Sequence, residues 1–574
     1  MLGLAIAVLM GGAIQDAHAY REMSVDLKTL TQTDDPMAPI IERFSADRRD
    51  LDRIYDVETS QKTFAGRRAF YHDWLDALGK LPFDSYNTVA KVDYVLLKNR
   101  IEGDLADLDV QERRIAKAAK YLPDLSIPTS LIEANRNMEP VDPEASAKKL
   151  TELADLLAAK QSEIKAPAPV KEEPDARFAA QMVDNYRQGL KHWFDFYNGY
   201  DPEFSWWCKK PYEQADHALD SYIKYLNEQV AKTETGEITG DPVGREALML
   251  DLQRAMIAYT PEELIDIANK EYAWCEKEMI KASREMGYGD DWKKALEAVK
   301  EDHVAPGEQP EMIRKLAWQA IDYVTKNDLV TVPDLAKRSW RMEMMSAERQ
   351  KVSPFFLGGQ TILVSFPTDE MTEEDKEMSM RGNNKHFAMA TVHHELIPGH
   401  HLQGFMNARY NTYRRAFSTP FWTEGWALWW EMLLYERGFP QTPEDRIGFM
   451  FWRMHRCARI IFSLKFHLGE MTPAECVDFL VDKVGHERAN AEGEVRRSFN
   501  GSYPPLYQLA YMTGALEFRS LYKDLVRSGK MTAKQFHDTI LHLNNMPIDA
   551  IRMIMKDKPP TRDYKTSWKF YTDP

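Results

Sequence analysis

Residues 392–401 read VHHELIPGHH, and residues 422–428 read WTEGWAL. These two stretches place imidazole and carboxylate side chains close together in the chain. Zinc prefers imidazole nitrogens and carboxylate oxygens, and a catalytic zinc site has three such protein ligands and one open position for water. A further glutamate beside the first histidine ligand is suited to accept a proton from that water. The two stretches therefore predict a zinc site with hydrolytic chemistry.

The spacing of the histidines predicts a break in regular helical geometry. His400 and His401 lie six and seven residues after His394, whereas two ligands on one helix face are usually four residues apart. In a regular helix His401 would share the face of His394 but lie roughly 10 Å along the axis, too far for one zinc, and His400 would lie on another face. Pro398 and Gly399 favour a bulge that shortens this distance. We expect His394 and His400 to be metal ligands, with His401 as the alternative to His400.

Three glutamates are candidates for the rest of the site. Glu395 is positioned to act as the general base that takes the proton of water and returns it to a leaving amine. Glu424 follows Thr423, a residue type that caps helices, so we expect it in the first turn of a helix, as the third metal ligand. Glu431 shares its face and could accept the ring N–H of a ligating histidine. Either stretch alone also fits a surface histidine cluster or a buried amphipathic helix, but together they favour a metal site.

The same residues resemble the signature of a bacterial family. The segments HELIPGHHLQ at 394–403 and TEGWAL at 423–428 are similar to those of the family called domain of unknown function 885, which is grouped with the gluzincin metallopeptidases. Further family-like segments occur at 259–264, 459–467, 471–475 and 494–514. The resemblance covers roughly residues 200–570.

The resemblance implies a fold, an activity and one further site residue. The fold would be mainly α, with many helices, a small β element and a deep cleft, comparable to angiotensin-converting enzyme or carboxypeptidase Taq. The activity would be that of a zinc hydrolase, and the substrates of the family are mostly unknown. Tyr511 matches a tyrosine position of the family. With Tyr503 and Tyr507, it is a candidate donor to the oxyanion that forms when water attacks a carbonyl.

The chain departs from the family pattern near its C-terminal end. Family members commonly have Arg-Tyr followed by Trp-Pro-Gly-Gln, whereas residues 496–508 here read RRSFNGSYPPLYQ. We expect this difference to affect substrate preference more than the chemistry. Arg459, His467 and Arg497 could bind a substrate carboxylate or form internal ion pairs, and for each one the internal role is favoured.

Composition limits the class of protein and of partner. The 574 residues are 44% hydrophobic and 28% charged, which is typical of a large soluble globular protein. A net charge of −15 without a long Lys/Arg run argues against a nucleic-acid partner. A peptide or small amide substrate remains open, and the oligomeric state is not predicted.

The N-terminal residues predict export. Residues 2–14 are apolar and Ala17-His18-Ala19 follows them as an Ala-x-Ala cleavage pattern, so residues 1–19 resemble a signal peptide of a bacterial periplasmic or secreted protein. The run lacks the usual basic start, so the initiator could lie upstream, or the segment could be a short helix. No later apolar run reaches membrane length, and we expect no transmembrane segment in the mature chain from Tyr20.

Periodic apolar positions, as at 261–279 and 292–299, predict helices through most of the chain. A Pro-rich and charged stretch at 164–175 predicts a loop or linker. We expect an N-terminal helical region at 20–165, a helical region of the family domain at 166–350 and a metal-site catalytic region at 351–574. Residues 361–367 predict a strand beside the cleft, either to pair with an extended peptide or as a small structural hairpin.

The spacing of the cysteines does not match a metal-binding motif. Cys208, Cys275, Cys457 and Cys476 are widely spaced and do not predict a disulfide framework. In an oxidising compartment Cys457 with Cys476 is the first candidate for a pair, and buried free thiols are the equal alternative.

These features together predict a zinc-dependent metallopeptidase with one Zn²⁺ per chain, in which Glu395 and the metal activate water to attack a peptide amide. A metal-dependent hydrolase of a non-peptide amide is one alternative. A helical envelope binding protein with a structural metal is another. A coordination sphere filled by protein ligands would favour the binding protein, and an open position beside Glu395 favours catalysis.

Overall fold

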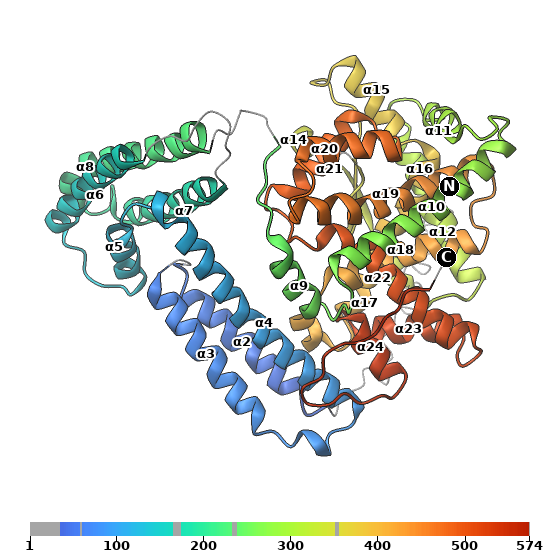
Figure 1. Ribbon diagram of the computed structural model, residues 1–574, viewed down its shortest axis with the longest axis horizontal. Coiled ribbons are helices and arrows are strands. Elements are labelled where there is room, and N and C mark those ends of the chain that lie inside the picture. Colours follow the sequence, from blue (N-terminus) through green and yellow to red (C-terminus); the bar gives the residue numbers. More distant parts are fainter. Residues whose placement is uncertain (1–34, 58–59, 165–173, 232–237, 351–354, 573–574) are drawn as a thin grey trace, which may run out of the picture. The chain divides into compact units, whose positions relative to one another are not determined.

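The computed structural model describes residues 35–57, 60–164, 174–231, 238–350 and 355–572 (Figure 1). This part of the chain is mainly helical with one two-stranded sheet, which confirms the predicted α class. The predicted signal peptide lies outside the described residues, as does most of the linker predicted at 164–175. Among the described residues, no helix combines the length and the apolar composition needed to cross a membrane.

The chain divides into two compact units. Of the described residues, the first unit comprises those within 35–41, 85–96 and 242–572, and the second comprises those within 42–84 and 97–241. The boundary expected at residue 165 therefore lies inside the second unit, because α6 (Pro143–Glu163) and α8 (Pro202–Lys224), on either side of it, pack against each other. The boundary expected at residue 350 lies inside the first unit.

The second unit is built from helices, and residues between Ala118 and Ala231 form one apolar core within it. Asp142 and Asp201 cap α6 and α8 through their side chains, and a proline follows each cap at the first helical position. The core includes Leu150, Leu190 and Phe204, all fully buried. The remaining helices that contribute to this unit are α2 (Ala38–Ile54), α3 (Gln61–Gly79), α4 (Thr88–Ala118), α5 (Ser126–Arg136) and α7 (Pro174–Tyr197).

The first unit contains the residues predicted to bind metal. Its helices are α9 (Gly244–Arg254), α10 (Pro261–Glu285), α11 (Trp292–Glu301), α12 (Gln309–Lys326), α13 (Asp334–Ser339), α14 (Ala347–Gln350), α15 (Glu373–Gly382), α16 (Lys385–Glu395), α17 (His400–Asn407), α18 (Pro420–Glu436), α19 (Pro443–His467), α20 (Pro473–Phe479), α21 (Arg488–Phe499), α22 (Tyr507–Tyr522), α23 (Ala533–Leu543) and α24 (Ile548–Met555). The long helix α19 is buried along most of its length and packs against α10, α16 and α22. Helices α16 and α18 are also buried on nearly all sides, so the predicted metal ligands belong to the core of the unit.

Two glycines allow α18 and α22 to approach closely. A Cβ atom added to Gly514 would lie 1.9 Å from the carbonyl oxygen of Phe421, and one added to Gly425 would lie 2.6 Å from the Cα of Gly514. Because no larger residue fits at either position, the helices touch backbone to backbone here. This contact places Glu424 on α18 beside the tyrosines at the start of α22.

The small sheet pairs β1 (Arg341–Met344) with β2 (Thr361–Val364) in parallel. The predicted strand at 361–367 is therefore present over its first four residues. The other edge of β2 is used at Leu363, which exchanges backbone hydrogen bonds with Leu357. This contact occupies part of the strand edge that would pair with an extended peptide, which was one of the two roles predicted for this strand.

All four cysteines are buried free thiols, so the candidate disulfide between Cys457 and Cys476 is wrong. Cys457 lies in α19 beside Cys275, whereas the sulfur of Cys476 in α20 faces the carbonyl oxygen of Phe462. The two thiols therefore have different neighbours.

Candidate metal centre

The two histidines come from separate helices. α16 ends at Glu395 and α17 begins at His400, so the bulge expected within one continuous helix is wrong. The backbone N–H of Gly399 donates to the carbonyl oxygen of His393 at 3.0 Å. A Cβ atom at Gly399 would lie 1.8 Å from the carbonyl oxygen of His394, which requires glycine at this position. The chain therefore turns back on the end of α16 and returns His400 to the side of His394.

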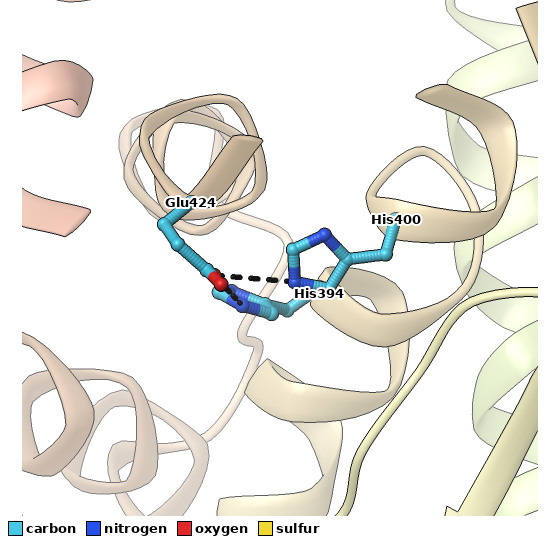
Figure 2. A group of neighbouring side chains, drawn as sticks. All are labelled: His394, His400 and Glu424. Carbon is cyan, nitrogen blue, oxygen red and sulfur yellow. Dashed lines mark ion pairs between the residues drawn. The ribbon is translucent and has the colours of Figure 1, made fainter. Parts of the chain in front are cut away.

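His394, His400 and Glu424 form a compact cluster (Figure 2). Glu424 Oε2 lies 3.6 Å from His394 Nε2 and 3.3 Å from His400 Nε2. One ligand atom from each of the three residues lies within 4.8 Å of the others. Among the described residues, this is the one group of three or more His, Cys, Asp or Glu side chains close enough to hold a metal ion.

The structure distinguishes between His400 and His401 as candidates for the second histidine ligand. His401 points away from the cluster, with Nε2 at 2.9 Å from the carbonyl oxygen of Ala336 and Nδ1 at 3.2 Å from that of Gly359. Its neighbour His400 has Nε2 toward Glu424, and its Nδ1 lies 2.9 Å from the side-chain nitrogen of Gln403. The geometry therefore favours His400 over His401.

Glu424 lies one turn further into its helix than expected. α18 begins at Pro420, and the capping residue is Thr419, whose hydroxyl accepts from the backbone N–H of Phe421. Thr423 is inside the helix, where its hydroxyl donates to the carbonyl oxygen of Thr419. The proline and the preceding threonine are the sequence signal for this start.

The cluster favours bound positive charge. Burial alone would lower the pKa of His394, but Glu424 and Glu431 raise it to about 9. Burial would raise the pKa of Glu424, but His400 and His394 hold it well below its usual range. Glu424 Oε2 is buried and has no hydrogen-bond partner among the described residues. Such an oxygen, beside two imidazoles, is suited to a cation.

Glu431 contacts His394 on the side of the ring that faces away from the cluster. Its Oε1 lies 2.6 Å from His394 Nδ1, which is the contact predicted from the spacing on α18. In the neutral, metal-binding form of His394, an N–H at Nδ1 that donates to Glu431 leaves the lone pair of Nε2 directed toward Glu424 and His400. The guanidinium of Arg456 lies 3.8 Å from the same Glu431 oxygen. Glu431 therefore fixes both the orientation and the tautomer of His394.

If the cluster holds zinc, replacing Glu431 by leucine is expected to weaken zinc binding by about 10- to 100-fold, because an unsupported His394 loses its fixed tautomer. Titration against a competing chelator measures the affinity. Glu431→Gln, which keeps a hydrogen-bond acceptor without the charge, should lose less. Equal affinity in the wild type and the leucine variant would remove Glu431 from a supporting role.

Glu395 lies beside the cluster, at the wall of a cavity of about 480 Å³. Its Oε2 is 4.0 Å from His400 Nε2. A Cβ atom on Gly358, in the segment before β2, would lie 2.4 Å from the Glu395 carboxylate, so glycine allows this segment to pass close to it. Burial is the main cause of the raised pKa of Glu395.

The tyrosines of α22 line the same cavity, and one of them has a role that the sequence did not reveal. The Tyr507 hydroxyl donates to Glu424 Oε1 and so holds the carboxylate that faces the histidines. The ring of Tyr511 stacks over His394, with 6.1 Å between ring centroids and an interplanar angle of 16°. Tyr511 therefore contacts a metal-ligand candidate, and its role as an oxyanion donor stays a prediction. Tyr503 contacts Tyr507, with ring centroids 4.2 Å apart.

Two of the arginine candidates meet one buried carboxylate. The Nε of Arg459 lies 2.6 Å from Glu494 Oε1, and the Nε of Arg497 lies 3.1 Å from Glu494 Oε2. Arg497 also lines the cavity, whereas Arg459 lies behind Tyr511, with its guanidinium 4.5 Å from the ring centroid. The third candidate, His467, is at the end of α19 and is not among the residues that line the cavity.

These observations define a mainly helical protein in which two histidines and a glutamate form a buried cluster beside a cavity. Residues 45–555 match the family described as "Bacterial protein of unknown function (DUF885)", and the chain belongs to this family. The match extends further toward the N-terminus than the segments that first indicated the resemblance. Among proteins with curated descriptions, none matches this chain.

Two solved structures share the fold. One is described as "a putative lipoprotein of unknown function from Shewanella oneidensis"; it is 19% identical, with a TM-score of 0.67, over 90% of this chain and 98% of the other. The second is described as "the putative lipoprotein from Colwellia psychrerythraea"; it is 16% identical, with a TM-score of 0.55, over 91% of this chain and 98% of the other. At these identities the likeness is one of fold alone.

Proposed function

We propose that the chain is a zinc-dependent hydrolase of the gluzincin metallopeptidase type that cleaves peptide amide bonds. The observation that carries this proposal is the position of Glu395, which lines one cavity together with His400 and Glu424. A carboxylate beside a candidate metal cluster is the arrangement that metal-assisted hydrolysis requires.

The donor set fits zinc. Two imidazole nitrogens and one carboxylate oxygen are ligands of catalytic zinc sites, and bonds of about 2.0–2.2 Å in a tetrahedral arrangement separate the ligand atoms by roughly 3.3 Å. The two distances from Glu424 Oε2, 3.3 and 3.6 Å, are close to this value. His394, His400 and Glu424 would therefore hold one zinc ion per chain.

Hydrolysis of an amide requires a general base for the water and a hydrogen-bond donor for the oxyanion. When bound, zinc would act as a Lewis acid that activates water and polarises the amide carbonyl. The Glu395 carboxylate would accept a proton from the attacking water and deliver it to the leaving nitrogen. A raised pKa brings a carboxylate closer to the operating pH and makes both transfers favourable. Tyr511 would donate a hydrogen bond to the oxyanion, while Tyr507 holds Glu424.

Access to the cluster supports catalysis over a purely structural metal. Structural zinc sites have four protein ligands, whereas catalytic sites have three and an open position. Three ligand candidates come together here, and the cavity reaches Glu395 and His400. Since the two similar solved structures are described as lipoproteins, we also propose that this chain is exported and acts in the bacterial envelope.

Metal analysis and a substrate search test the proposed function. Elemental mass spectrometry of the purified chain should find about one zinc per chain, and the His394→Ala variant should lose it. A peptide library incubated with the zinc-loaded chain should then yield cleavage products by mass spectrometry. Failure of the wild type to hold zinc after dialysis against it would contradict the metal centre. Bound zinc without peptide cleavage would instead favour a non-peptide amide as substrate.

A further inference from the structure

The core next to the metal centre contains more positive than negative charge. Arg456, Arg459 and Arg497 are buried, with side-chain exposures of 6%, 3% and 8%. Among the described residues, the carboxylates paired with them are Glu431 and Glu494, with exposures of 3% and 0%. Three guanidinium groups thus share two carboxylates, and one of these, Glu431, also accepts from His394.

Neighbouring side chains do not cancel this charge. His455 and His486 lie beside Glu494, with 2.8 Å between His486 Nε2 and His455 Nδ1, and burial lowers the pKa of both imidazoles. They are neutral and add no negative charge. Burial raises the pKa of the Tyr511 hydroxyl to about 12, so this residue is also neutral. A zinc ion would be balanced by Glu424 and Glu395, which leaves one guanidinium charge in excess.

The arginines also lack enough acceptors. The Nε atoms of Arg456 and Arg497 and one terminal nitrogen of Arg459 are buried without a hydrogen-bond partner among the described residues. Burial, and then the neighbouring Arg459, lower the pKa of the Arg456 guanidinium. A buried donor without an acceptor is costly, and an anion bound at Arg497 would supply an acceptor and balance the excess charge.

Arg497 is the member of this group that reaches the cavity. It lines the same cavity as Glu395, His400 and Glu424. Its guanidinium lies 5.3 Å from the ring centroid of Tyr503, which contacts Tyr507, and Tyr507 donates to Glu424. Arg497 is therefore separated from a metal-ligand candidate by two aromatic rings. Arg349, an exposed residue, adds a second guanidinium to the lining of the cavity.

We propose that Arg497 binds a carboxylate of the substrate, so that the preferred substrates are amides with a free carboxylate near the scissile bond, such as the C-terminal residue of a peptide. The planar guanidinium fork suits a carboxylate, and a hydrogen bond between two charged groups is stronger than one between neutral groups. This inference rests on the proposed function, both for the zinc ion in the charge balance and for the identity of the ligand as a substrate, but the binding of a carboxylate can be measured without hydrolysis.

The test compares carboxylates with amides of the same shape. Zinc-loaded full-length Glu395→Gln protein, in which turnover is blocked, is mixed with N-benzoyl amino acids bearing all twenty side chains and with the matching C-terminal amides. Ligands retained after ultrafiltration are identified by mass spectrometry, and their affinities are measured by calorimetry. We expect at least one acid to bind about ten-fold or more tightly than its amide, as for a hydrogen bond to a charged group.

Variants on α21 then assign this preference to one side chain. Adding Arg497→Gln to the Glu395→Gln protein should reduce the preference to about two-fold or less, and adding Arg497→Lys should retain part of it because the charge remains. Arg496→Gln is the matched control, since Arg496 is the adjacent arginine on the same helix and does not line this cavity. Thermal unfolding and zinc content show whether each variant is folded.

The outcomes separate this inference from the proposed function. Two results would contradict the proposed carboxylate site. One is that no acid binds more tightly than its amide to the Glu395→Gln protein that retains Arg497. The other is that the preference for acids survives in a folded protein that also carries Arg497→Gln. A carboxylate preference in a protein whose wild type cleaves no amide would support the carboxylate site and contradict the hydrolase. Cleavage of acids and amides at equal rates would support the hydrolase and contradict the carboxylate site.

Discussion

Replacing Glu395 by glutamine is expected to lower kcat by about 10²- to 10⁴-fold, the range that a positioned general base contributes. Glutamine has nearly the same shape but cannot accept the proton of water. Because Glu395 is not one of the three clustered metal-ligand candidates, the variant should still bind one zinc per chain. Steady-state kinetics on a cleaved peptide, together with elemental analysis of the same sample, measures both quantities.

Glu517→Gln is the matched control for this loss. Glu517 is also a fully buried glutamate of the first unit, neither of its carboxylate oxygens has a hydrogen-bond partner among the described residues, and it does not line the cavity. Burial raises its pKa well above the usual value, so the neutral amide closely replaces it. Full activity in Glu395→Gln, or an equal loss in Glu517→Gln, would exclude Glu395 as the base.

Removing the His400 imidazole is expected to weaken zinc binding by more than about 100-fold, because loss of a ligand costs more than loss of a group that supports one. His401→Asn should bind zinc as the wild type does, since both ring nitrogens of His401 face backbone carbonyl oxygens outside the cluster. The zinc affinities of the His400→Ala and His401→Asn variants are compared by competition with a chelator.

The reverse result would contradict the assignment of His400. If His401→Asn released zinc while His400→Ala retained it, the turn between α16 and α17 would have to place the other imidazole in the cluster. Asparagine keeps a polar side chain beside the carbonyl oxygens of Ala336 and Gly359, so a general loss of folding is not expected in this variant.

The members of the candidate site could be predicted from the sequence better than its geometry. The residue types at 394, 400 and 424 are sufficient to predict a three-residue cluster, which the structure contains, and the seven-residue spacing of Glu424 and Glu431 predicts their common face. The separation of α16 from α17 was not predicted, because it depends on the close approach of Gly399 to the carbonyl oxygen of His394. Local sequence shows that a helix is interrupted, but not where the chain goes next.

Long-range partners were the part that the sequence could not reveal. Tyr507 and Glu424 are 83 residues apart, and no periodic pattern connects them. The pairing of Arg459 with Glu494, 35 residues apart, depends in the same way on tertiary structure, whereas Arg497 is three residues from Glu494 on the same helix. The two-unit division also depends on tertiary contacts, because the second unit is formed from two separate segments of the chain.

The glycine contact between α18 and α22 links metal binding to the stability of the fold. Glu424 and its partner Tyr507 meet only when these helices have docked, so an unfolded chain has no equivalent of the cluster. A ligand that binds only the folded state stabilises it, by about 2.7 kcal/mol at a free concentration 100 times its dissociation constant. Zinc, if bound, would therefore stabilise the folded core as well as take part in the chemistry.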